Sequence, residues 1–170
     1  KITIIRAAGR VTFPCSFMLV AAMNPCRCGY FGDPTHTCTS RANDIRNYIA
    51  RISGPLLDRI DIQVELPTLT YDELSSRSSP EESSATIRER VIAARKFAER
   101  RFEGEKDIFC NAKLTAAMIR KYCVPDDAGR ELLRQAYESR GLSARGYDRT
   151  LRVARTIADL AGCETIGAVH

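Results

Sequence analysis

The sequence lacks any run of about 18 apolar residues, the length that a membrane-crossing helix needs. It also lacks a signal-peptide pattern, because its one short apolar stretch, residues 17–23, is not followed by a small-residue cleavage pattern. No internal repeat is visible. The seven cysteines are an odd number, and Cys26 and Cys28 stand too close together for a secreted disulfide framework. We therefore predict a cytoplasmic protein with no membrane partner.

Positive charge is concentrated in the first third of the chain. The 170 residues include 26 Lys and Arg against 21 Asp and Glu, a net charge of +5. Residues 1–51 hold seven basic and two acidic side chains, which accounts for the whole excess. We expect an electrostatic partner to bind near this part of the protein.

The first 68 residues carry the patterns of a mixed α/β region. Two short β-branched runs around Gly9 predict a hairpin with glycine available for a positive φ. These two runs are residues 1–5 and 11–13. The continuous apolar run at 17–23 predicts a buried parallel strand, and the alternating run at 60–66 predicts a half-buried strand. Between them, the amphipathic run at 43–52 predicts a helix.

After this region the patterns are helical. Residues 69–84 are rich in Ser, Glu and Pro and predict a linker. Four helices follow, with polar N-caps, a proline at one start and glycines after two ends. The first covers residues 84–103, and the second begins at the cap Asn111 and runs to Cys123. The third is opened by Pro125 and ended by Gly141. The fourth runs from the cap Ser143 to Leu160, and Gly162 stops it. The predicted fold is thus an α/β region over 1–68, a linker, and an all-α lobe over 85–170 that is truncated at its C-terminus. Since no Met begins the sequence, we expect a piece of a longer protein.

Three polar residues occupy positions with possible chemistry. Asn24 follows the predicted apolar strand, where open α/β sheets bind ligands, although an Asn before proline is also an ordinary turn residue. Arg59 stands between two carboxylates; it is either a surface arginine in local ion pairs or an arginine finger that neutralises charge on a γ-phosphate. Arg145 begins the last helix, where a cation opposes the helix dipole, so a solvated arginine is the less favoured interpretation.

The sequence reads VAAMNPCRCG at 20–29, RISGPLLDRID at 51–61 and LRVARTIADL at 151–160. In this order, these stretches resemble the magnesium-chelatase-like AAA+ ATPases, and most of all the competence-associated ComM/YifB subfamily. The resemblance implies that Asn24 is sensor 1, that Arg59 is an arginine finger acting on the ATP of a neighbouring subunit, and that Arg145 is sensor 2 of a helical lid. It also implies ATP and Mg²⁺ as cofactors and a homohexameric ring for the full-length protein.

The Walker A pattern Gly-x-x-x-x-Gly-Lys-[Ser/Thr] is absent from the sequence, and no acidic cluster follows an apolar strand as a Walker B motif. We therefore expect this chain alone to be inactive as an ATPase. In related ring motors a hairpin before sensor 1 projects into the pore, and Arg6-Ala7-Ala8-Gly9-Arg10 resembles its basic tip. The resemblance makes Arg6, Arg10 and Lys1 candidate contacts for DNA phosphates, although a solvated turn would carry the same charges.

A second candidate site is a cysteine-rich loop. Cys26, Cys28 and Cys38 resemble the subfamily's Cys-x-Cys…Cys-x-Cys loop, which would suit a structural Zn²⁺. The fourth position is Ser40, so His36, two residues before Cys38, is the candidate substitute ligand. The alternative is a loop that packs without metal.

Three functions stay open at this point. The favoured one is a hexameric motor that couples ATP hydrolysis to DNA remodelling or branch migration in natural transformation. The first rival is a chelatase-type ATPase subunit that remodels a protein partner for metal insertion. The second rival is a non-catalytic, zinc-stabilised helical binding module.

Overall fold

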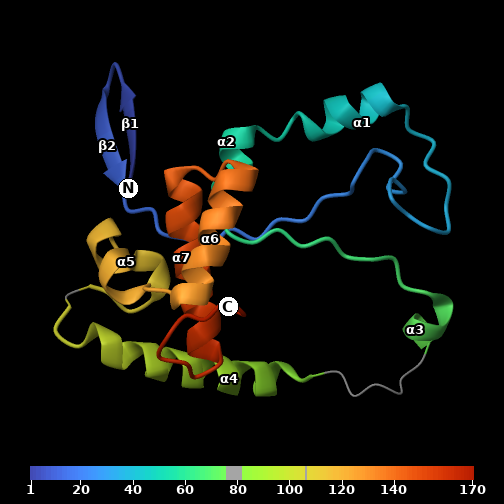
Figure 1. Cartoon of the computed structure of the whole chain (residues 1–170). Coiled ribbons are helices and arrows are strands. Elements are labelled where there is room, and N and C mark those ends of the chain that lie inside the picture. Colours follow the sequence, from blue (N-terminus) through green and yellow to red (C-terminus); the bar gives the residue numbers. More distant parts are fainter. Residues whose placement is uncertain (76–81, 106) are drawn as a thin grey trace. The chain divides into compact units, whose positions relative to one another are not determined.

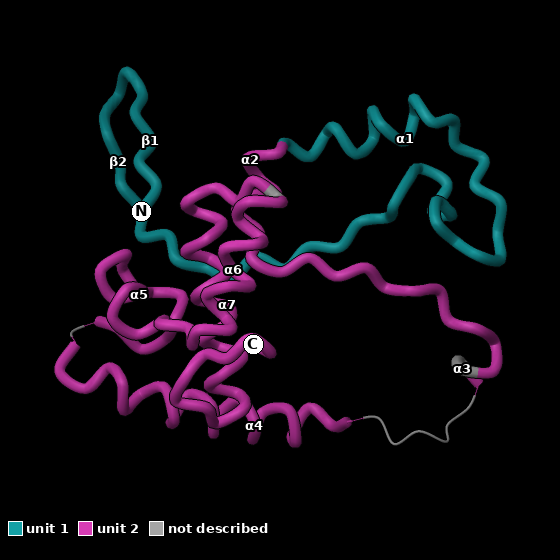
Figure 2. The backbone as a smooth tube through the Cα atoms, in the orientation of Figure 1, with its two compact units in different colours: residues 1–53 teal, residues 54–170 magenta. Residues whose placement is uncertain are grey.

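The structure, a computed structural model, describes residues 1–75, 82–105 and 107–170. The chain divides into two units, residues 1–53 and residues 54–170 (Figure 2). The proposed functional division at residues 68 and 84 stays a prediction. No helix of the described residues is long and apolar enough to cross a membrane.

The N-terminal hairpin is formed as predicted. Strands β1 (Ile2–Arg6) and β2 (Gly9–Phe13) pair antiparallel (Figure 1), and the register places Arg6 opposite Gly9. Gly9 has a φ of 143°, a conformation that a side chain would strain. A two-residue turn therefore closes the hairpin between Arg6 and Gly9.

The two other predicted strands are wrong. Residues 17–23 and 60–66 have irregular backbone, and apolar side chains such as Met18 and Leu66 are both 87% exposed. A strand needs a neighbour for its backbone N–H and C=O groups, and β1 and β2 are the one paired sheet in the described residues. The apolar and alternating patterns were therefore not sufficient to form strands here, because neither segment has a partner strand in the described residues.

Unit 1–53 has almost no apolar core. The predicted helix at 43–52 is present as α1 (Ala42–Ile49), ending three residues early. In residues 1–53, all of which the structure describes, only Cys26 and Ile45 are buried. So small a core gives this unit little hydrophobic stabilisation of its own.

The regular structure in the described residues of unit 54–170 is helical, as expected for the predicted all-α lobe, whose bounds at 85–170 stay a prediction. Inside the predicted linker a short helix forms, while residues 76–81 of that linker lie outside the described residues. The last predicted helix has its predicted cap, since the Ser143 hydroxyl accepts from the backbone N–H of Gly146. The elements are α2 (Gly54–Leu57), α3 (Tyr71–Ser75), α4 (Ser84–Glu99), η1 (Arg100–Phe102), η2 (Asn111–Lys113), α5 (Ala116–Tyr122), α6 (Asp127–Arg140) and α7 (Ala144–Leu160).

Two predicted helix starts need correction. Thr115, not Asn111, caps α5, and Asp126, the residue after Pro125, caps α6. Asn111 is instead buried, and its side chain donates to the Asp159 carboxylate at 2.8 Å. An asparagine is a good cap only when its side chain faces its own backbone, and here a buried partner takes it.

Helix α7 is the centre of the helical unit and packs against α4, η2 and α5. Its buried residues recur at helical spacing, as expected for a core-facing stripe. Phe102 and Tyr122 meet edge to face beside it, with ring centroids 6.0 Å apart. The buried core consists of Ala98, Phe102, Leu114, Ile119, Cys123, Leu151, Ala154, Ala158 and Ile166.

The same stripe of α7 carries a buried ionic network. Asp159 accepts hydrogen bonds from both terminal nitrogens of Arg101, at 3.1 and 2.6 Å, and from Nε of Arg155 at 3.0 Å. Arg155 also donates to the backbone carbonyls of Glu164 and Cys163, so it ties the end of α7 to the segment that follows. The charges are buried but well partnered.

Candidate functional site

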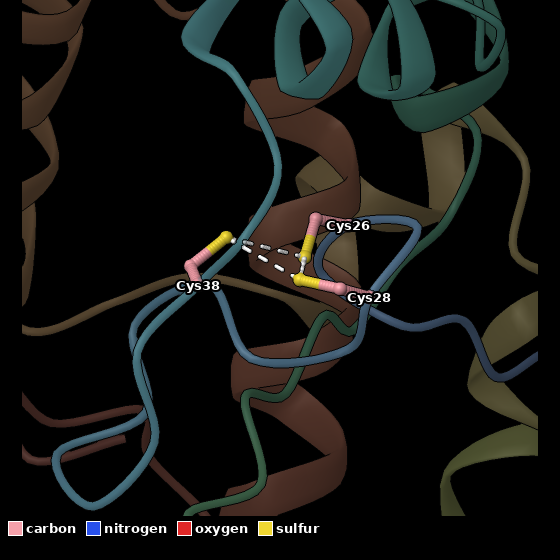
Figure 3. Close-up of side chains that lie close together, drawn as sticks. All are labelled: Cys26, Cys28 and Cys38. Atoms are coloured by element: carbon pink, nitrogen blue, oxygen red, sulfur yellow. Dashed lines mark hydrogen bonds between the residues drawn. The ribbon is translucent and has the colours of Figure 1, made fainter.

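The three cysteines of the predicted metal loop come together. Their Sγ atoms are separated by 3.2 Å for Cys26 and Cys28, 3.5 Å for Cys28 and Cys38, and 3.8 Å for Cys26 and Cys38. Figure 3 shows the three thiols pointing toward one another, although Cys38 comes from ten residues further along the chain than Cys28. We call these three residues the thiol cluster.

The geometry of the thiol cluster fits zinc. With Zn–S distances of about 2.3 Å, a tetrahedral ion holds its sulfur ligands about 3.8 Å apart. The observed separations of 3.2 to 3.8 Å are close to this value. Unit 1–53 also has almost no core, and an ion holding three sulfurs would stabilise the loop that the apolar residues do not.

The fourth ligand position is not filled by His36. Its ring stacks on Tyr30, with centroids 4.7 Å apart, and its Nδ1 lies 2.9 Å from the Thr35 hydroxyl. The residue beside the sulfurs is Ser40, whose hydroxyl donates to Cys28 Sγ at 3.3 Å. The structure thus brings together three of the four predicted ligands and places a hydroxyl where the subfamily's loop would have a fourth cysteine.

Hydrogen bonds prepare the cluster for metal by favouring thiolates. The Ser40 hydroxyl, the Tyr30 backbone N–H and Cys26 lower the pKa of Cys28 from 9.0 to about 5. Burial acts in the opposite direction and raises the pKa of Cys38. Since the thiolate is the metal-binding form, Cys28 is the sulfur best suited to bind first at neutral pH.

The two arginines of the hairpin tip lie on opposite faces of the hairpin. Arg10 is opposite Ile5 and therefore shares its face, whereas Arg6, the next residue of β1, projects from the other face. Both arginines are exposed. Lys1 adjoins the far end of β1, about 17 Å of strand away from Arg6, so it belongs to a different part of the surface.

The predicted ATP-site residues are divided between the two units. Asn24 is exposed and follows irregular backbone rather than the end of a strand. Arg59 and Arg145 both lie in unit 54–170 and are exposed. Arg59 follows α2 and donates from Nη1 to the carbonyl oxygen of Pro55 at 2.5 Å, so its guanidinium rests on its own turn.

Sequence reasoning missed Arg149 of α7. Its Nη1 donates to the carbonyl oxygens of Asp58 and of Ile60, the second at 3.2 Å. It also missed the network around Asp159. Two charged residues four positions apart within an apolar helical stripe, Arg155 and Asp159, were the available signal for that network, whereas no sequence pattern indicates the partners of Arg149.

Comparison with known proteins establishes the family. Residues 1–74 match the family model "Magnesium chelatase, subunit ChlI", and residues 81–170 match "Magnesium chelatase, subunit ChlI C-terminal". The chain therefore belongs to the magnesium-chelatase-like family, and the resemblance found in the sequence is confirmed.

Individual relatives match along the whole chain. It is 39% identical over all 170 residues to competence protein ComM of Haemophilus influenzae, and 38% identical over the same length to YifB of Salmonella typhimurium and of Escherichia coli. Each match covers 100% of this chain and 32% of the relative, so the chain spans about a third of the length of these relatives.

Proposed function

We propose that this chain is the sensor, arginine-finger and lid region of a hexameric AAA+ ATPase that couples ATP hydrolysis to DNA remodelling, including branch migration in natural transformation. The observation that carries the proposal is the 39% identity to competence protein ComM across all 170 residues. The exposed positions of Arg59 and Arg145 support it, because a residue that contacts phosphate must be accessible. The phosphate-binding Walker motifs of the proposed motor lie outside this sequence.

In the proposed mechanism, Arg59 of one subunit completes the ATP site of its neighbour. Its planar guanidinium can stabilise the charge that develops on the γ-phosphate, after leaving the Pro55 carbonyl where it rests. Arg145 contributes a second guanidinium from the first turn of α7, and Asn24 contributes a neutral amide to orient the attacking water. ATP with Mg²⁺ would supply the transferable phosphoryl group.

Mixed rings test the role of Arg59. Full-length Arg59→Ala subunits are mixed with full-length Asn24→Ala subunits, and ATPase activity is measured. If Arg59 acts on the neighbour's ATP and Asn24 on its own, mixed rings regain activity that neither variant has alone, because an Arg59→Ala subunit with intact Asn24 receives the finger of its Asn24→Ala neighbour. A mixture of Arg59→Ala with Arg134→Ala, a variant at an exposed arginine of α6, is the matched control. Mixed Arg59→Ala and Asn24→Ala rings that stay as inactive as the separate variants would contradict a role in trans.

The hairpin provides the test for DNA. Because Arg6 and Arg10 lie on opposite faces, a DNA backbone that contacts one face loses affinity in one of the two alanine variants more than in the other. The affected variant should also lower the salt dependence of binding, by a slope of about one per lost phosphate contact. Unchanged DNA affinity in both variants would favour the chelatase-type alternative, in which the ring remodels a protein partner.

We further propose that the thiol cluster binds a structural Zn²⁺ through Cys26, Cys28 and Cys38. The sulfur separations and the lowered pKa of Cys28 support this assignment. Metal analysis of the purified protein tests it, and protein without zinc at any stoichiometry would refute it.

A further inference from the structure

The segment that carries Arg59 is attached to helix α7 by one side chain. Arg149 donates from Nη1 to the backbone carbonyls of Asp58 and Ile60, which are the residues on either side of Arg59. The guanidinium therefore holds the backbone of residues 58–60, which we call the finger loop, on both sides of the proposed finger.

The finger loop is largely exposed to solvent. Asp58, Arg59 and Asp61 are exposed, and only Ile60 is half-buried. Beside the junction lies a hollow of about 200 Å³ lined by Asp61, Arg149 and His170, so close apolar packing does not replace the hydrogen bonds there. Hydrogen bonds from a charged donor are stronger than neutral ones, so Arg149 is well suited to fix this loop.

We propose that Arg149 is a positioning residue that couples the lid helix α7 to the arginine finger Arg59. Arg149 is four residues after Arg145 and therefore lies on the same face of α7. A movement of α7 when Arg145 engages nucleotide is transmitted through Arg149 to the finger loop and changes how Arg59 is presented to the neighbouring subunit. This inference rests on the proposed ATPase function, and it assigns to that site a residue that transmits regulation between subunits.

Hydrogen exchange tests the attachment without relying on ATP. The full-length variants Arg149→Ala and Arg134→Ala are compared with wild type, and amide exchange is followed by mass spectrometry in peptides that cover residues 56–62. Loss of the attachment should speed exchange there by about 10-fold or more, with no change in Arg134→Ala. Unchanged exchange in Arg149→Ala would overturn the inference, whatever the ATPase assays show.

A double-mutant cycle tests whether Arg149 acts through Arg59. ATPase kcat is measured for Arg59→Ala, Arg149→Ala and the pair, at saturating ATP. We expect Arg149→Ala to lower kcat by about 10-fold in the wild-type background and to add almost nothing in the Arg59→Ala background. Effects that multiply in the double variant would overturn the inference, since Arg149 would then act by another route.

Two further comparisons separate the possible failures. Arg149→Lys keeps the charge but replaces the planar fork with a single ammonium, and it should restore part of both the exchange protection and kcat. No recovery of either, with normal thermal unfolding, would contradict a hydrogen-bonding role. If Arg59→Ala by itself leaves kcat unchanged, the proposed finger function fails, and the exchange experiment still reports on the attachment alone.

Discussion

Replacing Asp159 is the most demanding test of the helical unit. Its side chain is 3% exposed and accepts hydrogen bonds from Arg101, Arg155 and Asn111. The Asp159→Ala variant leaves the guanidinium of Arg155, 1% exposed, and that of Arg101, 12% exposed, without their carboxylate. Breaking a buried ion pair in this way costs about 3–5 kcal/mol.

The local contacts place the expected loss at the lower end of this range. Arg155 keeps its hydrogen bonds to the carbonyls of Glu164 and Cys163, and Arg101 can turn partly toward solvent. We therefore expect a loss of about 3 kcal/mol in the free energy of unfolding for Asp159→Ala. Asp159→Asn keeps the shape and one acceptor oxygen, so it should lose less.

The chain offers a matched control in an exposed pair. Glu131 and Arg134 of α6 are 50% and 59% exposed and form an i,i+3 ion pair at 2.7 Å. Glu131→Ala should cost no more than about 1 kcal/mol, because water solvates both charges. Urea unfolding followed by circular dichroism measures all three variants. Equal losses for Asp159→Ala and Glu131→Ala would refute the argument that burial makes the Asp159 network essential.

Three further predictions concern the thiol cluster and the lid helix. Cys28→Ser should abolish zinc binding, and His36→Ala should leave it unchanged. Ser40→Cys should tighten zinc binding by about 10-fold or more, because it supplies a fourth thiolate. A zinc titration against a chelating dye measures the affinity of each variant. In chelator-treated protein, iodoacetamide should label Cys28 before Cys38 at pH 6–7. The reason is that the pKa of Cys28 is about 5, so its thiolate is lost only as the pH falls through that value, whereas burial raises the pKa of Cys38. Equal labelling of the two cysteines, measured by mass spectrometry, would contradict this. Ser143→Ala should destabilise α7 by about 1 kcal/mol in urea unfolding, and an unchanged midpoint would show that the cap contributes nothing.

Local patterns determined the hairpin, α4 and α7. Each of these elements makes its main-chain hydrogen bonds within a short stretch of sequence, and its ends carry their own signals. Gly9 permits the positive φ of the hairpin, and Ser143 caps the start of α7. The family could also be recognised from sequence, because three motifs occur in the family's order along the chain. These conclusions needed no knowledge of distant contacts.

Only the tertiary structure decided the rest, because each remaining feature joins residues that are distant in sequence. The segments 17–23 and 60–66 have strand patterns but no partner strand in the described residues, and a pattern cannot supply one. The fourth residue beside the sulfurs is Ser40 and not His36, since loop packing and not spacing sets which side chain reaches them. The attachment of Arg149 to the loop around Arg59 spans about ninety residues, and only folding brings such groups within hydrogen-bonding distance.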